Sequence, residues 1–243
     1  MILFGLLALL SPGCDTPGDL MDPMEKRRYQ MVDSQIVARG VKDPRVLFAM
    51  RKVPRHLFVP QAQMPFAYED HPVPIGSGQT ISQPYIVAFM TEQLQLTGGE
   101  KILEIGTGSG YQAAVLAEIA KAVFSIEIRP ELAQEARARI TAAGIKNVSI
   151  KVADGYRGWP EEAPFDGIIV TAAPETVPPP LLEQLAVGGR MVIPVGGFYQ
   201  ELKVIERKPA GFLEQSVLPV RFVPFVGEAE AKGGATPEPA PER

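Results

Sequence analysis

The sequence predicts an α/β fold: a Rossmann-like, doubly wound and mainly parallel sheet, preceded by a helical segment and closed by an antiparallel strand pair. Short apolar runs alternate with helical segments of about 10–15 residues between 101 and 195, which indicates βαβ units. A glycine-rich turn follows the first run, at the place where such folds bind ligands. The 243 residues, 46% of them hydrophobic and 21% charged, suffice for one buried domain.

The N-terminal part predicts helices joined by irregular chain. Helical spacing of apolar residues marks the first of these helices, and Asp43 or Ser82 close before a Pro marks the start of the other two. We expect them at 25–39, 43–54 and 82–96. Ser82 would cap the third, with Pro84 in its first turn. Residues 60–79 are rich in Pro and Gly, and we interpret them as irregular, with a short hairpin as an alternative.

The sheet is expected to use five parallel strands and a closing pair. The predicted parallel strands are 101–105, 123–127, 148–152, 165–170 and 190–195. The helices between them are expected at 111–120, 130–143 and 181–186, and Gly188-Gly189 leads into the fifth strand. The antiparallel pair is expected at 201–207 and 213–222.

Both ends of the chain are expected to lie outside the domain, which we place at 25–227. Residues 1–24 form a signal-like or linker segment. An apolar run, small residues and Cys14 follow one another as in a lipoprotein signal, but no Lys or Arg precedes them. The alternative is a translation start at Met21 or Met24. Residues 228–243 are rich in Ala, Pro and Glu without apolar periodicity, which predicts a disordered tail.

Charge and residue usage narrow the function classes. The net charge of −4 gives the surface no overall attraction for nucleic acid, so no nucleic-acid partner is expected. One cysteine, Cys14, and two distant histidines, His56 and His71, predict no disulfide and no metal site. We expect a cytoplasmic protein without stable membrane contact. Export or lipid anchoring through Cys14 is the alternative, and the oligomeric state stays open.

The run Glu104-Ile-Gly106-Thr107-Gly108-Ser-Gly110 ends the first predicted strand and opens its helix. Glycines allow a tight turn and bring backbone N–H groups close to a ligand near a helix start. The spacing departs from the Gly-x-Gly-x-x-Gly of dinucleotide sites, which argues against NAD. A second acid, Glu127, ends the next strand.

Glu127 lies 21 positions beyond Gly106, where a carboxylate can accept both ribose hydroxyls of an adenosine. Asp154-Gly155 follows the third strand, where a side chain can reach the adenine amino group. Each residue alone also fits a turn or a strand end. Together, at the carboxyl ends of successive parallel strands, they indicate a nucleoside site.

This combination resembles the pattern of class I S-adenosylmethionine-dependent methyltransferases. The resemblance implies S-adenosyl-L-methionine as cofactor, bound across Gly106–Gly110, Glu127 and Asp154. After the fourth strand, Thr171-Ala-Ala-Pro174 lacks the Asn/Asp-Pro-Pro-aromatic motif of enzymes that methylate base amines. It suits a nucleophile that needs no deprotonation, such as a carboxylate.

The run Gly78-Gln-Thr80-Ile81-Ser82-Gln-Pro84 resembles a signature of the protein-L-isoaspartate O-methyltransferases. The resemblance extends over roughly 26–226 and includes the segments 51–60 and 218–224. It implies methyl transfer from S-adenosyl-L-methionine to the α-carboxylate of L-isoaspartyl residues in damaged proteins and peptides, which initiates their repair.

The resemblance also implies roles for particular residues. Ser82 is the implied active-site residue, which would orient the substrate carboxylate, and Thr80 to Ser82 would close over the cofactor. The implied peptide site contains Arg221, Phe222, Val223 and Pro224.

Two alternatives remain open. The first is a methyltransferase for a small molecule or RNA, which a basic face around the cofactor cleft would favour. The second is a non-catalytic binding or scaffold protein on this fold. A degraded glycine loop or a missing Glu127 would favour that, and neither occurs in the sequence.

Overall fold

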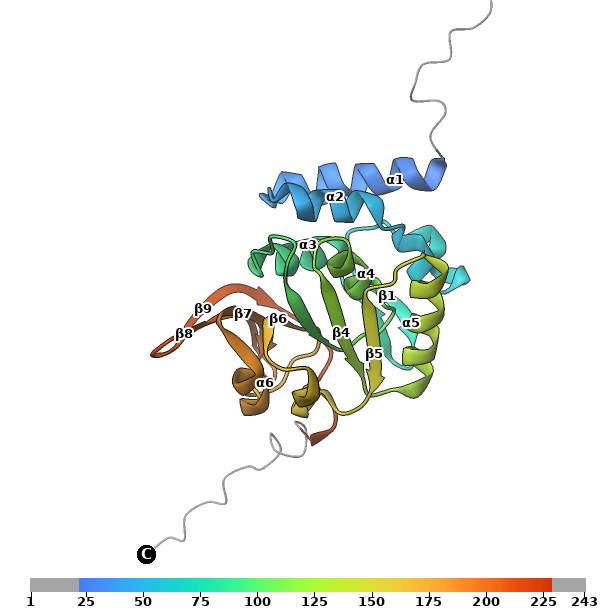
Figure 1. Ribbon diagram of the computed structural model, residues 1–243. Helices are drawn as coiled ribbons and strands as arrows, with labels where there is room; N and C mark the ends of the chain where they lie inside the picture. Colours follow the sequence, from blue (N-terminus) through green and yellow to red (C-terminus); the bar gives the residue numbers. More distant parts are fainter. Residues whose placement is uncertain (1–21, 229–243) are drawn as a thin grey trace, which may run out of the picture.

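A seven-stranded sheet runs through the centre of the protein (Figure 1). Its strands are β3 (Lys101–Ile105), β4 (Ala122–Glu127), β5 (Val148–Val152), β6 (Phe165–Val170), β7 (Leu185–Val195), β8 (Gln200–Lys208) and β9 (Gly211–Val220). They lie in the order β5-β4-β3-β6-β7-β8-β9, parallel from β5 to β7 and antiparallel at β8 and β9. The predicted fold class, including the closing strand pair, is therefore confirmed.

The computed structural model describes residues 22–228. Its α-helices are α1 (Pro23–Met31), α2 (Pro44–Lys52), α3 (Pro84–Gln93), α4 (Tyr111–Ala117), α5 (Pro130–Ala142) and α6 (Pro179–Gln184). The signal-like segment with Cys14 and the Ala/Pro/Glu-rich tail after 228 lie outside the described residues.

Successive residues of each central strand face opposite sides of the sheet, so the sheet buries two hydrophobic cores. One core packs the sheet against α2, α3 and α4, and the other against α6. The first contains Ile102, Val123, Ile169 and Val192. The second contains Leu103, Ile126, Ile168 and Met191. These alternating pairs explain why the strands read as continuous apolar runs in the sequence.

The N-terminal helices form an outer layer, with α1 and α2 lying over α3 (Figure 1). The Asp22 side chain caps α1 by accepting from the Met24 amide at 2.8 Å. The helix therefore begins at Pro23, inside the expected linker. It continues through a π turn at Val32–Ile36 and ends in the left-handed region at Gly40. Within 22–228, no helix combines the length and apolarity needed to span a bilayer.

The expected cap of α3 is wrong. Pro84 has no N–H to donate and occupies the first helical position, so the residue directly before it becomes the cap. That residue is Gln83, which has extended backbone angles and makes no side-chain capping bond. Ser82 lies one position too early to cap. Upstream, β1 (Val73–Gly76) and β2 (Gln79–Ile81) form the hairpin held as an alternative.

Two strand boundaries also differ from expectation. β7 begins at Leu185, so Gly188-Gly189 lie within the strand, where its register with β6 shifts, rather than in a turn before it. At the other end of the sheet, β9 stops at Val220. Arg221 and Phe222, expected in the strand, therefore lie beyond it. The chain that follows crosses the carboxyl ends of the parallel strands, where it pairs with Ala173.

Candidate cofactor and substrate site

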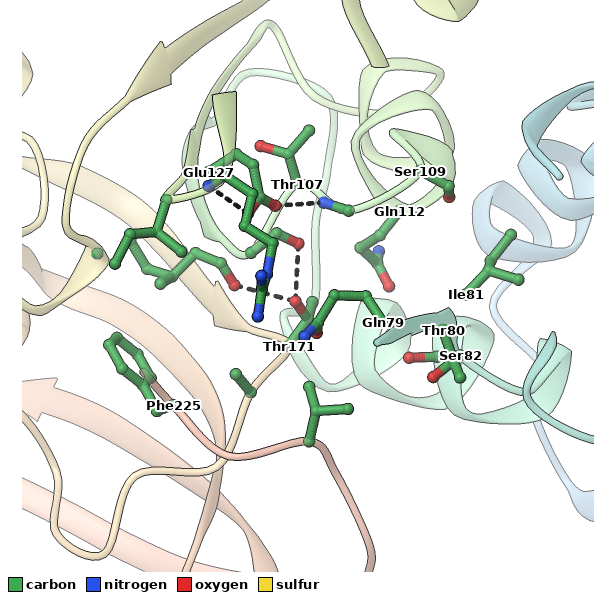
Figure 2. Close-up of a pocket in the computed structure, with 18 of the residues that line it drawn as sticks. Gln79, Thr80, Ile81, Ser82, Thr107, Ser109, Gln112, Glu127, Thr171 and Phe225 are labelled. Atoms are coloured by element: carbon green, nitrogen blue, oxygen red, sulfur yellow. Dashed lines mark hydrogen bonds between the residues drawn. The ribbon is translucent and has the colours of Figure 1, made fainter. Parts of the chain in front are cut away.

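Two adjoining pockets open where β3, β4 and β6 end, at the carboxyl edge of the sheet. Figure 2 shows the first of them. Of the predicted site residues, the first pocket is lined by Thr80, Ile81, Ser82, Gly106, Thr107, Gly108, Glu127, Gly155, Val223 and Pro224. The second is lined by Arg221 and Phe222, and it shares Thr80, Ser82, Thr171 and Val223 with the first. The structure thus brings most predicted residues together.

The glycine loop after β3 is bonded to the end of β6. The Thr171 hydroxyl lies 2.8 Å from the Gly106 carbonyl and 3.0 Å from the Ile105 carbonyl, and it donates to these oxygens. Gly106 has φ +94, and a Cβ there would lie 2.3 Å from the Thr171 Oγ1. Both its backbone angle and this contact require glycine at the position.

The Glu127 carboxylate is held in place by backbone amides on two sides. Its Oε2 accepts from the Gly108 amide at 2.8 Å, and its Oε1 accepts from the Arg129 amide at 3.0 Å (Figure 2). The residue is 5% exposed and lines the first pocket. Each oxygen has a further lone pair, so the group offers a fixed, charged acceptor to a ligand.

Glu104 lies beneath the glycine loop, with no accessible surface. Its carboxyl accepts from the Ser125 hydroxyl, whose oxygen lies 2.5 Å from the Thr107 Oγ1. Burial raises the pKa of Glu104 to about 8, so the carboxyl is mostly protonated at neutral pH. Glu104 therefore supports the glycine loop from below and does not line the pocket.

Gly110 and Asp154 also lie behind the walls. Gly110 is the N-cap of α4, with φ +87. The Asp154 carboxylate accepts from the Tyr156 amide at 2.9 Å and from the Glu228 amide at 2.7 Å. It thereby ties the chain at 228 to the end of β5, while Gly155 beside it lines the first pocket.

Ser82 lies on the wall common to both pockets, away from Glu127 in Figure 2. Its backbone carbonyl accepts from Arg55 Nη2 at 2.6 Å, while Arg55 Nε donates to the Ala67 carbonyl at 2.7 Å. Within 22–228, no hydrogen bond involves the Ser82 hydroxyl. The backbone of Ser82 is thus fixed while its hydroxyl stays available to a ligand.

Arg55 is itself completely buried. Its guanidinium lies 4.9 Å from the centre of the Tyr111 ring, directly after the glycine loop. Burial lowers its pKa to about 10, which leaves the group charged at neutral pH. One buried side chain therefore connects the N-terminal helical layer, the Ser82 segment and the start of α4.

The segment after β9 crosses the strand ends and joins the two pockets. The Ala173 amide donates to the Val223 carbonyl at 2.9 Å, and the Phe225 amide donates to the Ala173 carbonyl at 3.0 Å. This pairing places Val223 and Pro224 on the first pocket and leaves Arg221 and Phe222 on the second.

Several lining residues were missed by the sequence interpretation. They are Gln79, Ser109, Gln112, Arg129, Thr171 and Phe225. Thr171 directly follows β6, so the rule that ligands bind at the carboxyl ends of parallel strands applies to it, but the sequence interpretation used its segment only to compare nucleophiles. Gln112 belongs to α4 and gives no sequence signal, because only the packing of the helix turns it toward the pocket.

Known proteins are similar to this chain over most of its length. Residues 26–230 match the family model described as protein-L-isoaspartate(D-aspartate) O-methyltransferase. The protein-L-isoaspartate O-methyltransferase of Picosynechococcus sp. is 55% identical over 86% of this chain and 94% of its own length. Protein-L-isoaspartate O-methyltransferase 1 of Syntrophobacter fumaroxidans is 58% identical over 84% of this chain and 96% of its own length.

Two solved structures share the fold. One named protein-L-isoaspartate O-methyltransferase matches with a TM-score of 0.75 and 30% identity, over 84% of this chain and 66% of that chain. The other, described as a beta-aspartate methyltransferase (PCMT) from Plasmodium falciparum in complex with S-adenosyl-L-homocysteine, matches with a TM-score of 0.73 and 25% identity. That match covers 82% of this chain and 98% of the other.

The buried Glu104 generates a pH-dependent prediction. Its pKa is about 8 in the folded protein against 4.5 ordinarily, so the folded state binds this proton more tightly than the unfolded state. The free energy of unfolding therefore falls as pH rises from 4.5 to about 8 and then levels. Glu104→Gln removes this titration. Relative to the wild type, its free energy of unfolding should rise by about 4 kcal/mol between about pH 5 and about pH 8.

Urea unfolding of both proteins at the two pH values measures this difference. Glu183→Gln, at an exposed glutamate of α6, is the control and should follow the wild-type pH profile. Parallel profiles for Glu104→Gln and the wild type would show that the Glu104 carboxyl is already ionised in the fold.

Proposed function

This chain belongs to the protein-L-isoaspartate(D-aspartate) O-methyltransferase family, and we propose that its two adjoining pockets divide the reaction of that family between them. The enzyme transfers a methyl group from S-adenosyl-L-methionine to the α-carboxylate of L-isoaspartyl residues in damaged proteins and peptides. The first pocket would hold the cofactor and the second the peptide. The observation that carries this division is that Ser82 and Thr171 lie on the wall common to both.

The residues of the first pocket fit an adenosine. Glu127 presents a carboxylate that two amides already hold in place, so little ordering is needed before it accepts the ribose hydroxyls. Phe225 and Gly155 border the pocket beyond it and offer an apolar surface to adenine. Asp154 lies behind this wall, where its two amide bonds hold the chain next to Gly155, so we propose a supporting role for it instead of contact with the adenine amino group.

When bound, S-adenosyl-L-methionine supplies an electrophilic methyl group on a sulfonium. The protein needs no general base, because a substrate carboxylate is ionised at neutral pH. Its residues therefore contribute mainly alignment and the exclusion of water. In this proposal the Ser82 hydroxyl donates a hydrogen bond to the carboxylate and orients it toward the first pocket. Arg55 holds the Ser82 backbone in place through its 2.6 Å bond.

The second pocket suits a peptide because the end of β9 and the segment after it run along one of its walls. Arg221 adds a positive charge to a wall that must accept a substrate carboxylate. Phe222 and Val223 supply apolar surface, while backbone groups of the crossing segment are in reach of an extended peptide. We propose Arg221, Phe222, Val223 and Pro224 as the peptide-binding segment.

We also propose that the working enzyme is cytoplasmic, because its cofactor is made and held inside cells. The order of apolar and small residues before Cys14 is the observation against this. Mass spectrometry of the native N-terminus tests it. An unmodified N-terminal segment is expected, and a diacylated Cys14 would show a lipid-anchored protein instead.

Loss of the Glu127 carboxylate should weaken cofactor binding. Glu127→Ala removes two ribose hydrogen bonds to a charged acceptor, each worth about 1.5–3 kcal/mol. The Kd for S-adenosyl-L-methionine should therefore rise at least about a hundredfold, measured by titration calorimetry. Glu131→Ala, at a glutamate in the first turn of α5, is the matched control and should bind normally. Wild-type affinity in Glu127→Ala would remove this residue from the site.

Ser82→Ala tests both the reaction and the role of the serine. The readout is labelled methyl transfer from S-adenosyl-L-methionine to a synthetic L-isoaspartyl peptide. A hydrogen bond made chiefly in the transition state affects kcat, so kcat should fall at least about tenfold, or about 1.4 kcal/mol. Because Ser82 does not cap α3, stability should change by less than about 0.5 kcal/mol.

Three controls complete this experiment. Ser82→Thr keeps a hydroxyl and should retain much more activity than Ser82→Ala. Ser216→Ala, at an exposed serine on β9, should behave as the wild type. The aspartyl isomer of the peptide should accept no label. Full turnover by Ser82→Ala would exclude the proposed role, and equal labelling of both isomers would contradict the isoaspartyl specificity.

A further inference from the structure

Two aromatic side chains project into solvent at the turn between β7 and β8. Phe198 is 89% exposed and Tyr199 is 86% exposed, the highest values among the exposed large apolar residues of 22–228. Their rings are 5.0 Å apart in an edge-to-face arrangement. Single exposed apolar residues are common on protein surfaces. Two neighbouring rings with this exposure form a small apolar surface, and such surfaces mark places where another molecule binds.

The turn that carries these rings is held tightly. Gly196 has φ +130, and a Cβ there would lie 2.0 Å from the Tyr199 carbonyl oxygen. The turn therefore folds back on itself so closely that only glycine fits. The Gly196 amide also donates to the Pro174 carbonyl at 2.9 Å. This bond fastens the turn to the loop that follows β6, which contributes Thr171 to both pockets.

The other end of the turn is fastened to the peptide-binding segment. The Gln200 side chain accepts from the Phe222 amide at 2.6 Å and donates to the Phe222 carbonyl at 3.3 Å. Phe222 lines the second pocket. The turn is thus bonded to two of the segments that border this pocket. Because β7 runs parallel to β3 and β6, the turn also lies at the same carboxyl edge as the pockets.

We propose that Phe198 and Tyr199 form an aromatic contact for the polypeptide substrate, where it leaves the second pocket on one side of the isoaspartyl residue. This inference rests on the proposed function. An isoaspartyl residue in a damaged protein has chain on both sides, and unfolded chain exposes apolar side chains. Rings held on a fixed turn can bind such side chains with little loss of conformational freedom. The turn that carries the rings is hydrogen-bonded to Pro174 and Phe222, in two of the segments that form the pocket proposed for the modified residue.

The contact lies outside the reacting groups, so it should contribute equally to binding before and during methyl transfer. Its loss should therefore raise KM and leave kcat unchanged. The effect should depend on substrate length. A peptide with about seven residues on each side of the isoaspartyl residue extends about 25 Å in each direction, whereas a peptide of about four residues stays within the pocket region.

The test compares two double variants on these two peptides, the longer carrying apolar residues on both flanks. The variant Phe198→Ser with Tyr199→Ser removes both rings. The matched control, Phe212→Ser with Leu213→Ser, removes two exposed apolar residues beside the β8–β9 turn, at the opposite end of β8, and neither residue lines a pocket of the site. Melting temperature and the Kd for S-adenosyl-L-methionine are measured for each protein.

The expected result is a rise in KM of fivefold or more for the long peptide with Phe198→Ser/Tyr199→Ser. Its kcat, its KM for the short peptide and its cofactor Kd should match the wild type, and the control variant should match throughout. An unchanged KM for the long peptide would overturn the proposal, as would an equal rise for both peptides.

The alternative is that a second copy of this chain covers the two rings. Sedimentation of the wild type and of Phe198→Ser/Tyr199→Ser tests it by measuring their oligomeric states. A wild-type dimer that the two substitutions dissociate would overturn the proposal in favour of a subunit contact. Failure of the proposed function is distinct, since the wild type would then label neither peptide.

Discussion

The position of β3 between two parallel neighbours is the constraint on which the site depends. β3 pairs with β4 on one side and β6 on the other, so its end cannot shift along the sheet. The Gly106 amide donates to the Ile126 carbonyl at 2.8 Å, and the Thr171 amide donates to the Ile105 carbonyl at 2.9 Å. The glycine loop therefore starts between the two strand ends, with Glu127 at one of them.

Two buried ionisable groups support this edge in different ways. In the described part of the chain Glu104 has no cationic partner, so burial keeps its carboxyl mostly protonated beneath the loop. Arg55 stays charged and directs its donors to the carbonyls of Ala67 and Ser82. Removing polar groups from water is costly, and these groups recover part of that cost through hydrogen bonds. The bond from Arg55 fixes the backbone of Ser82 on the pocket wall, and the bond between Ser125 and Glu104 lies beneath the glycine loop.

The substrate side is assembled from segments that are distant in the sequence. The hairpin of β1 and β2 leads to Ser82, the loop after β6 supplies Thr171, and the chain after β9 returns to pair with Ala173. Gln200 holds Phe222 and fastens the aromatic turn to the same wall. A change in any one of these connections would alter the second pocket, and a change at Thr171 would also reach the glycine loop that holds Glu127.

The sequence by itself determined the succession of strands and helices along the chain from 101 to 220. It also determined the glycine loop and the acid at the end of β4. These features follow from local periodicity, from the backbone freedom of glycine and from the rule that ligands bind at the carboxyl ends of parallel strands. Only the tertiary structure decided that Glu104 lies under the loop and that Asp154 holds the chain at 228. It also showed Ser82 bonded to Arg55 instead of capping α3. These outcomes depend on contacts between residues far apart in the chain, and no local pattern records which buried partner a polar side chain will meet.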